Sequence, residues 1–388
     1  MKRIYAVLMC MILASASLAG CAQSGGDSKA DSSVQESSKE KSSAAEESSA
    51  VEESSEAESS AEESKAEENT ELKAELRAKF LEKADQVIVE ADSVTFEDAS
   101  SETVTIQKNP QKTVNLYGSF TTLWYEAGGT VEGCIGGDSA ITLYQEYIGR
   151  DITQDEGVTV VATSSSGKKW DVESIVALQP DLIICSTAMS GYSTIQAPAE
   201  AAGIPVIAMS YNDFSDYLKW FKVFCNLNSQ EELWDTVAMP ALDSVVEILA
   251  KCPTEDTPRV FSMFSGAESL QANTTNTVVG EMIEEMNAVN IVDEWENASG
   301  AERLDINLET VYAADPDIIV VQCHAGAEVA QQQIQEAYGE NPVWQSLWAV
   351  QEGQVYYLEK ELFHNKPNSR FAEAYQKLAE ILYPDLEL

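Results

Sequence analysis

Two hydrophobic periods follow one another along the chain from about residue 93. Ser93–Glu97 and Thr103–Gln107 alternate apolar and polar residues, which predicts two paired strands. Beyond them, apolar runs such as Thr113–Tyr117 and Leu182–Cys185 alternate with helical patterns such as Gly118–Ala127. Strands that alternate with helices of this length predict a parallel, doubly wound α/β sheet.

The middle of the chain lacks strand patterns. Apolar residues keep one helical face from about Ser229 to Lys251, and Pro240 is expected to kink this long helix. A second strand-and-helix pattern begins at Arg259–Phe264. We therefore expect an α/β fold in which two doubly wound parallel-sheet lobes are joined by one long spine helix. The expected bounds are 71–214 for the N-terminal lobe, 215–252 for the linking helices and 253–388 for the C-terminal lobe.

A repeat relates the two lobes. Asp171–Ile184 and Asn307–Val320 each predict a short helix, a Pro-Asp stop and a buried strand. Glu173 and Glu309 stand at the same place in the two copies, seven residues before the proline. Two unrelated units of this kind are the alternative, and the equal spacing disfavours that alternative.

The N-terminus has the pattern of an export signal. Lys2 and Arg3 precede the apolar run Ile4–Leu18, which is too short to span a membrane. The run ends in Leu18-Ala19-Gly20-Cys21, which resembles a bacterial lipobox. We expect residues 1–20 to be a signal peptide and Cys21 to be a lipid anchor. An ordinary signal peptide that happens to end near a cysteine is the alternative.

A polar tract follows Cys21. Residues 22 to about 70 are nearly all Ser, Glu, Ala, Lys and Asp, so they lack the apolar surface that would offset the entropy lost on ordering. We expect the lipidated cysteine and a disordered spacer to occupy 21–70. The spacing of Leu72, Leu76 and Phe80 predicts a short helix over about 70–85, where the folded part begins.

Charge and cysteine content narrow the class of partner. The formal net charge is −41, which argues against nucleic acid and against a polybasic membrane contact. The cysteines beyond the signal and the anchor lack the CxxC spacing of zinc or redox sites. We therefore expect no cofactor and five buried, unpaired thiols, which are Cys134, Cys185, Cys225, Cys252 and Cys323.

Lipobox, spacer, two lobes and a single helical spine together resemble the substrate-binding lipoproteins of ABC importers. More narrowly, they resemble the helical-backbone class, class III, which serves the uptake of iron–siderophore complexes, haem or cobalamin. The most specific segments are Val94–Val114, Pro258–Phe264 and Phe363–Pro384, together with the two repeat units. The first segment departs from the family pattern, with Ser101 where Gly is usual and Gln107 where Pro is usual.

This resemblance implies a monomeric receptor, not an enzyme, on the extracytoplasmic face of the cell membrane and attached to it by the lipid alone. Its partners would be an ABC permease with its ATPase and a small-molecule metal complex. In that family an exposed Glu on each lobe docks against arginines of the permease, and Glu173 and Glu309 fall at the matching positions. Two solvated glutamates on helix surfaces are the alternative.

Ligands of open α/β sheets bind beyond the carboxyl ends of the strands, and two such edges that face each other would form an interlobe cleft. The loops at these edges are rich in aromatic and hydroxyl side chains and modestly basic. Such loops suit a bulky, partly apolar ligand with anionic or oxygen-rich edges. The candidate ligand-binding residues are Tyr117, Ser119, Phe120, Ser165, Lys168, Trp170, Met189, Tyr192, Tyr211, Phe264, His324, His364 and Lys366.

The sequence leaves several ligands open. His324 and His364, the only histidines, could be axial ligands to haem iron or cobalt, or plain polar residues of the loops. A bare metal ion is disfavoured because its site normally needs several clustered ligands. The scarcity of arginine in these loops counts mildly against a catecholate complex.

An iron complex, siderophore or haem, is the expected ligand. A cobalamin or corrinoid receptor of the same class is the alternative. A surface enzyme or an adhesion receptor is less favoured, because the sequence shows no nucleophile elbow and no phosphate-binding glycine loop.

Overall fold

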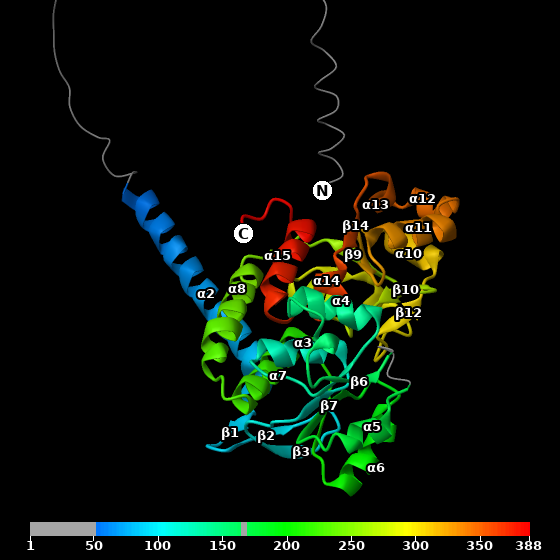
Figure 1. Cartoon of the computed structure of the whole chain (residues 1–388). Coiled ribbons are helices and arrows are strands. Elements are labelled where there is room, and N and C mark those ends of the chain that lie inside the picture. Colours follow the sequence, from blue (N-terminus) through cyan, green and yellow to red (C-terminus); the bar gives the residue numbers. More distant parts are fainter. Residues whose placement is uncertain (1–51, 164–168) are drawn as a thin grey trace, which may run out of the picture. The chain divides into compact units, whose positions relative to one another are not determined.

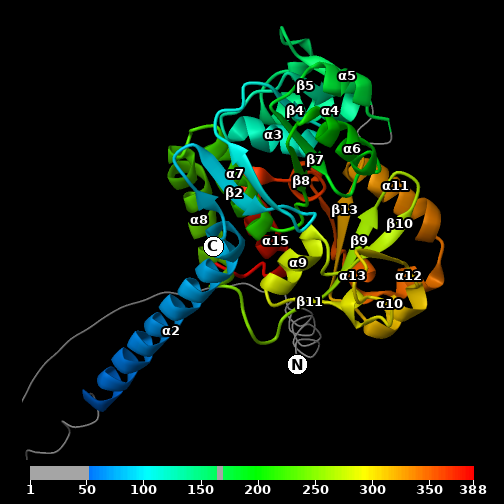
Figure 2. The same ribbon diagram turned by 90° about the horizontal axis from the view of Figure 1, so that it is seen from below.

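The first helix in the described part of the chain is the long helix α2 (Glu52–Asp85). The computed structural model describes residues 52–163 and 169–388, and Figures 1 and 2 show it from two directions. The helix expected over about 70–85 is present, whereas the disorder expected up to residue 70 is wrong from Glu52 onward. Glu, Ala and Lys have high helix propensity, so a segment without an apolar face can extend a helix that packs at its other end. Cys21 lies outside the described residues.

Three antiparallel strands follow in the order β1-β2-β3. β2 (Ser93–Glu97) and β3 (Thr103–Gln107) have the predicted bounds and pair along their whole length. β1 (Ile88–Val89) pairs with the other edge of β2. The alternation therefore predicts these strands correctly, because it places Val94 and Phe96 on the buried face of the pleat.

The N-terminal lobe is built on a five-stranded parallel sheet with the order β6-β5-β4-β7-β8. The strand order reverses between β4 and β7, which is where doubly wound sheets open a crevice for ligands. Its strands are β4 (Thr113–Asn115), β5 (Gly133–Ile135), β6 (Thr159–Ala162), β7 (Leu182–Ser186) and β8 (Val206–Met209). Its helices are α3 (Gly118–Glu126), α4 (Asp138–Tyr147), the 3-10 turn η1 (Ile152–Gln154), α5 (Val172–Ala177) and α6 (Tyr192–Ala202).

Two helices lead from the first sheet to the second. α7 (Phe214–Leu227) is largely buried, and α8 (Met239–Leu249) follows after the π-helical turn η2 (Trp234–Ala238). Pro240 lies in the first turn of α8, where its missing N–H is tolerated. The wider π turn directly before it interrupts the regular helix, so the irregularity expected at the proline is present one turn earlier.

The C-terminal lobe has a six-stranded sheet with the order β12-β10-β9-β13-β14, and β11 also pairs with β9. β10 runs antiparallel to β9 and β12, so this sheet is mixed where a parallel one was expected. A short connection links β9 to β10, and only an antiparallel pair can be joined that way. Its strands are β9 (Arg259–Ser265), β10 (Leu270–Asn273), β11 (Val289–Asn290), β12 (Arg303–Asp305), β13 (Ile318–Cys323) and β14 (Val355–Leu358). Its helices are α9 (Val278–Glu285), η3 (Ile291–Glu294), α10 (Leu308–Ala314), α11 (Ala327–Tyr338), α12 (Pro342–Ser346), α13 (Trp348–Gln351), α14 (Lys360–Phe363), η4 (Asn368–Arg370) and α15 (Phe371–Leu382).

The repeat is present in both sheets as the same backbone clamp. The N–H of Asp181 donates to the carbonyl of Lys112 at 2.8 Å, and its carboxylate accepts from the N–H groups of Gln111 and Lys112 at 2.8 and 3.1 Å. Asp317 exchanges the equivalent bonds with Arg259 at 2.8 and 2.9 Å. Each Pro-Asp stop therefore fastens β7 or β13 to the beginning of the first strand of its lobe, β4 or β9.

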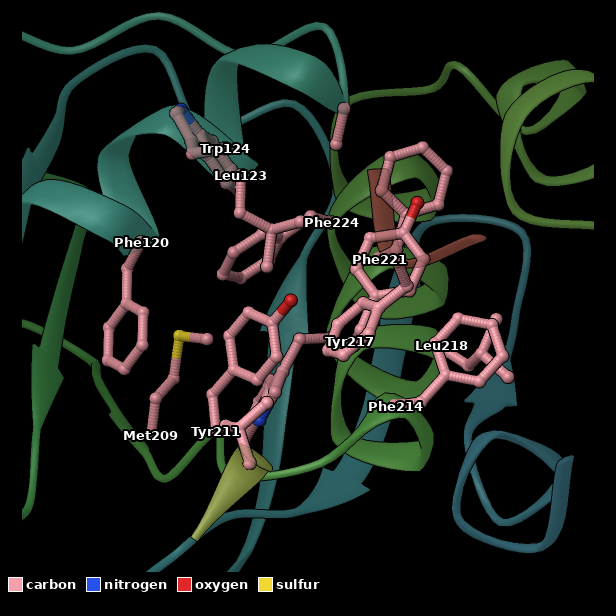
Figure 3. Packing of buried hydrophobic residues seen from close by; sticks show 14 of the residues in the cluster. Phe120, Leu123, Trp124, Met209, Tyr211, Phe214, Tyr217, Leu218, Phe221 and Phe224 are labelled. Carbon is pink, nitrogen blue, oxygen red and sulfur yellow. The ribbon is translucent and has the colours of Figure 1, made fainter. Parts of the chain in front are cut away.

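A continuous hydrophobic core joins the N-terminal lobe, α7 and α15. The ring of Phe214 lies 5.0 Å from that of Phe371 and 6.1 Å from that of Tyr375. At the other end of α7, Phe224 lies 5.0 Å from Trp124 of α3, in the cluster shown in Figure 3. Aromatic pairs at such distances contribute about 0.5–1.5 kcal/mol each beyond their buried area. A second core cluster fills the C-terminal lobe.

The C-terminal end of α2 bonds to elements of both lobes. Nζ of Lys83 lies 2.6 Å from Asp213 and 2.7 Å from Asp216, at the start of α7. Nζ of Lys79 lies 2.9 Å from Glu285 of α9, whose carboxylate is buried. α2 is therefore fastened to the start of α7 and to the C-terminal lobe at once.

The five cysteines expected to be buried thiols are all buried and unpaired. Burial raises the pKa of Cys252 and of Cys323 to about 11, so these thiols stay protonated at neutral pH. Within residues 52–163 and 169–388, no helix is long and apolar enough to cross a membrane.

Phe80 tests whether α2 belongs to the core. Its ring is buried 5.2 Å from that of Phe214, so Phe80→Ala should lower the free energy of unfolding by about 3–5 kcal/mol. Leu72 lies on the same helix but is 37% exposed, and Leu72→Ala should change the same quantity by about 0.5 kcal/mol or less. Urea unfolding of both variants measures the difference. Equal effects would show that α2 does not pack as described.

Candidate functional site

The candidate site lies at the strand ends where each sheet reverses its order. Tyr117 and Phe120 follow β4, and Tyr211 follows β8 in the same lobe. Phe264 lies at the end of β9, and His324 directly follows β13. The first strand of each sheet, β4 or β9, pairs in parallel with the strand of its repeat unit, β7 or β13. The repeat therefore carries the two sets of side chains to equivalent edges.

The N-terminal lobe contributes an aromatic group, which consists of Tyr117, Phe120 and Tyr211. The rings of Tyr117 and Phe120 lie 4.6 Å apart, and those of Phe120 and Tyr211 are stacked at 6.4 Å. Figure 3 shows Phe120 and Tyr211 beside Met209, the last residue of β8. Burial raises the pKa of Tyr117, so its hydroxyl stays neutral at physiological pH.

The C-terminal lobe contributes a histidine pair. Nδ1 of His324 lies 2.8 Å from Nε2 of His364, so one ring donates a hydrogen bond to the other. The ring of Phe264 is stacked on His364 at 5.8 Å. Burial, followed by the nearby positive charges, lowers the pKa of His364 to about 3, and burial and Lys360 lower that of His324. Both rings are therefore neutral at physiological pH.

Arg303 of β12 lies beside Phe264, next to the histidine pair, and the sequence did not predict it as a site residue. Its guanidinium carbon lies 4.2 Å from the centroid of the Phe264 ring, in cation–π contact. Burial lowers the pKa of Arg303. β12 is a short strand, and only its pairing with β10 brings the arginine beside Phe264. No local sequence signal marks such a contact.

Lys366 connects the two lobes at the site. Its Nζ lies 5.2 Å from the centroid of Tyr211, and burial lowers its pKa to about 8. Asn368 fixes the same segment, because it accepts a hydrogen bond from the Tyr211 hydroxyl at 3.3 Å and donates one to Thr122 of α3 at 3.2 Å. The segment that carries His364 and Lys366 is thus held against the aromatic group.

The two cations of the site, Arg303 and Lys366, have few anionic partners. Among the residues that the structure describes, Lys366 has no ion-pair partner, and the ion pair of Arg303 is with the exposed Glu302 at 3.6 Å. No group of three or more His, Cys, Asp or Glu within this part of the chain could hold a metal ion. Half-buried cations of one sign raise the free energy of the empty site, and an anionic ligand would lower it.

The remaining candidate residues are buried in or packed against the core, line another hollow, or fall outside the described residues. Trp170 is buried in the core between β6 and α5, and Met189 packs against the same core. Tyr192 accepts a hydrogen bond from Gln196 and lines a separate hollow of about 440 Å³ beside β8. Ser119 is buried in the first turn of α3. Ser165 and Lys168 fall outside the described residues.

Glu173 and Glu309 occupy matching places on the two lobes. Each lies exposed in the first turn of a short helix, α5 or α10. The side chains of Asp171 and Asn307 cap these helices by accepting bonds from backbone N–H groups. One carboxylate per lobe is thus presented to solvent from the same kind of turn.

A family model described as periplasmic binding protein matches residues 117–362, more than half of the chain. The matched range contains the aromatic group, the histidine at the end of β13, Arg303 and both exposed glutamates.

Two curated proteins of Bacillus subtilis (strain 168) are similar to the chain. The uncharacterized ABC transporter substrate-binding lipoprotein YvrC is 24% identical over 297 residues, which cover 75% of this chain and 86% of that protein. The Fe(3+)-citrate-binding protein YfmC is 24% identical over 272 residues, which cover 70% and 79%. Among solved structures, an ABC transporter substrate-binding protein from Listeria monocytogenes EGD-e aligns with a TM-score of 0.57 at 18% identity. That alignment covers 72% of this chain and all of the other, and it supports the fold alone.

The histidine pair gives a test of the site's electrostatics. With only two histidines in the chain, side-chain NMR resolves both. His364 should stay neutral at pH 5, and His324→Gln should raise its pKa because one source of positive charge is removed. Since the folded pKa lies below the unfolded one, the stabilisation from neutral His364 is full above about pH 6.5 and is lost as pH falls toward about 3. An ordinary titration of His364 near pH 6.5 would contradict this geometry.

Proposed function

The chain belongs to the periplasmic binding protein family and is a substrate-binding component of an ABC importer, and we propose that it captures an iron complex, siderophore or haem, between its two lobes. It is a binding protein rather than an enzyme. We also propose that Cys21 carries a lipid that holds it at the extracytoplasmic face of the membrane. Similarity to a lipoprotein supports this anchor.

One observation carries the proposed ligand. The aromatic group of one lobe and the cations of the other meet through the contact of Lys366 with Tyr211. Tyr117, which is half-buried, offers apolar surface to the body of an iron chelate, and Phe120 and Tyr211 pack behind it in the core. Arg303 and Lys366 offer donors to the anionic oxygens of the chelate. Similarity to a protein named for Fe(3+)-citrate supports the same class. Cobalamin, the alternative, carries a single phosphodiester anion, whereas ferric citrate and haem carry two or more carboxylates that could pair with both cations.

A ligand panel tests this proposal. The purified protein should bind ferric citrate or haem in a titration followed by visible absorption, and cobalamin should bind at least about tenfold more weakly. Binding of cobalamin alone would refute the proposed iron complex. Lys366→Gln should weaken the preferred iron complex about tenfold or more, whereas Lys366→Arg should retain most of the affinity because it keeps the charge.

The proposed docking residues are tested separately. Glu173→Ala combined with Glu309→Ala should abolish uptake of the iron complex by cells and leave its affinity in solution unchanged, because neither carboxylate lies at the ligand site. Glu200→Ala with Glu328→Ala, also one exposed glutamate per lobe, should leave both quantities unchanged. If the first pair lowered ligand affinity as much as uptake, docking would not be its role.

A further inference from the structure

A row of buried side-chain amides lies beneath the cationic half of the site. Nε of Arg303 donates to Oδ1 of Asn273 at 3.0 Å. Nδ2 of Asn273 donates to Oε1 of Gln322 at 3.2 Å, and Nε2 of Gln322 donates to the carbonyl of Phe363 at 2.6 Å. The bonds therefore lead from β12 through β10 and β13 to the end of α14.

Burying this row of amides adds little to the stability of the fold. Asn273 is fully buried and Gln322 nearly so, in a sheet whose core is otherwise largely apolar. Burying an amide costs free energy that its hydrogen bonds only partly return, so apolar residues of the same shape would often be equally stable. A chain of such bonds does, however, hold its end groups in one geometry.

Both ends of the amide row lie at the candidate site. One end is Arg303, a residue of the site, and the other is Phe363, which directly precedes His364. At one end, Asn273 occupies Nε of Arg303, and the contact of Nη1 with the exposed Glu302 is long at 3.6 Å, which leaves Nη2 for a ligand carboxylate. At the other end, the carbonyl of Phe363 directly precedes His364, and Lys366 follows two residues later. The row thus fixes the position of Arg303 relative to the segment that carries Lys366.

We propose that Asn273 and Gln322 are positioning residues that hold Arg303 and the 364–366 segment at the separation needed to grip one polyanionic ligand. The proposal rests on the proposed function for the identity of the ligand and deepens it by assigning selectivity for anionic over uncharged complexes. Neither residue touches the ligand itself. Their effect passes through the two cations.

A ligand-free experiment tests the coupling. Gln322→Met keeps the shape of the side chain and removes its amide. In NMR spectra it should shift the His364 signals and speed hydrogen exchange at Nε of Arg303 at least about tenfold, although Gln322 does not contact Arg303. Gln345→Met is the control, since Gln345 lies in the same lobe and its Nε2 donates to the Gly339 carbonyl, off the row. It should change neither signal, and equal behaviour of the two variants would overturn the proposal.

A conservative variant tests the direction of the bonds. Asn273→Asp keeps the acceptor for Arg303 and loses the donor to Gln322, whose own amide must then turn toward the new carboxylate and release Phe363. Arg303 should stay protected from exchange while the His364 signals shift. If Gln322→Met failed to fold, this variant would decide the question, and unshifted His364 signals would overturn the coupling.

Binding measurements test the selectivity. Gln322→Met should weaken ferric citrate about tenfold or more, flatten the dependence of that affinity on salt, and change the affinity for uncharged ferrichrome less than about twofold. Equal losses for both complexes would overturn the assigned selectivity. If wild-type protein bound neither complex while the NMR coupling persisted, the proposed function would fail and the positioning role would stand.

Discussion

The packing of α7 against α15 places both halves of the candidate site. Phe214 and Phe371 are in ring contact, and both are buried. Tyr211 precedes the first of these residues by three positions, and Asn368 precedes the second by the same number. Once the helices are packed, the loop that ends β8 and the segment that leads into α15 have little freedom. Their hydrogen bond is then a consequence of the core rather than a separate feature.

The charges near this core are more positive than the overall composition suggests. The chain has a formal charge of −41, yet cations gather at the lobe junction. Lys83 of α2 bonds to Asp213 and Asp216, the same carboxylates whose negative charge raises the pKa of Lys366 against the effect of burial. By neutralising them, α2 leaves Lys366 without a close counter-ion and so favours a ligand that supplies one. The helix nearest the proposed anchor therefore also contributes to the electrostatics of the site.

Hydrophobic periodicity predicted the elements whose bounds are decided by residues close together in the sequence. β2 and β3 have their expected bounds because alternation alone decides which face is buried, and α5 ends where Pro180 stops it. Contacts made by strand pairing could not be read in this way. Arg303 reaches Phe264 only through the register of β12 and β10. The burial of Trp170 in the core and the position of Tyr192 at the start of α6, beside another hollow, likewise depend on packing. The extension of α2 to Glu52 was missed because low apolar content indicates little burial, not the absence of a helix.

The repeat explains why the site is geometrically symmetric and chemically asymmetric. The clamps of Asp181 and Asp317 lie at the start of β7 and β13, opposite the strand ends that carry the candidate site, so they constrain both sheets alike. The opposite ends are free of that constraint, and there the lobes differ: aromatic rings after β4 and β8, cations and amides around β9 and β13. The antiparallel β10 and β12 occur only in the C-terminal sheet, and they bring in Asn273 and Arg303. The strands that depart from the expected parallel sheet therefore supply Arg303, one of the two cations of the site, and the amide that holds it.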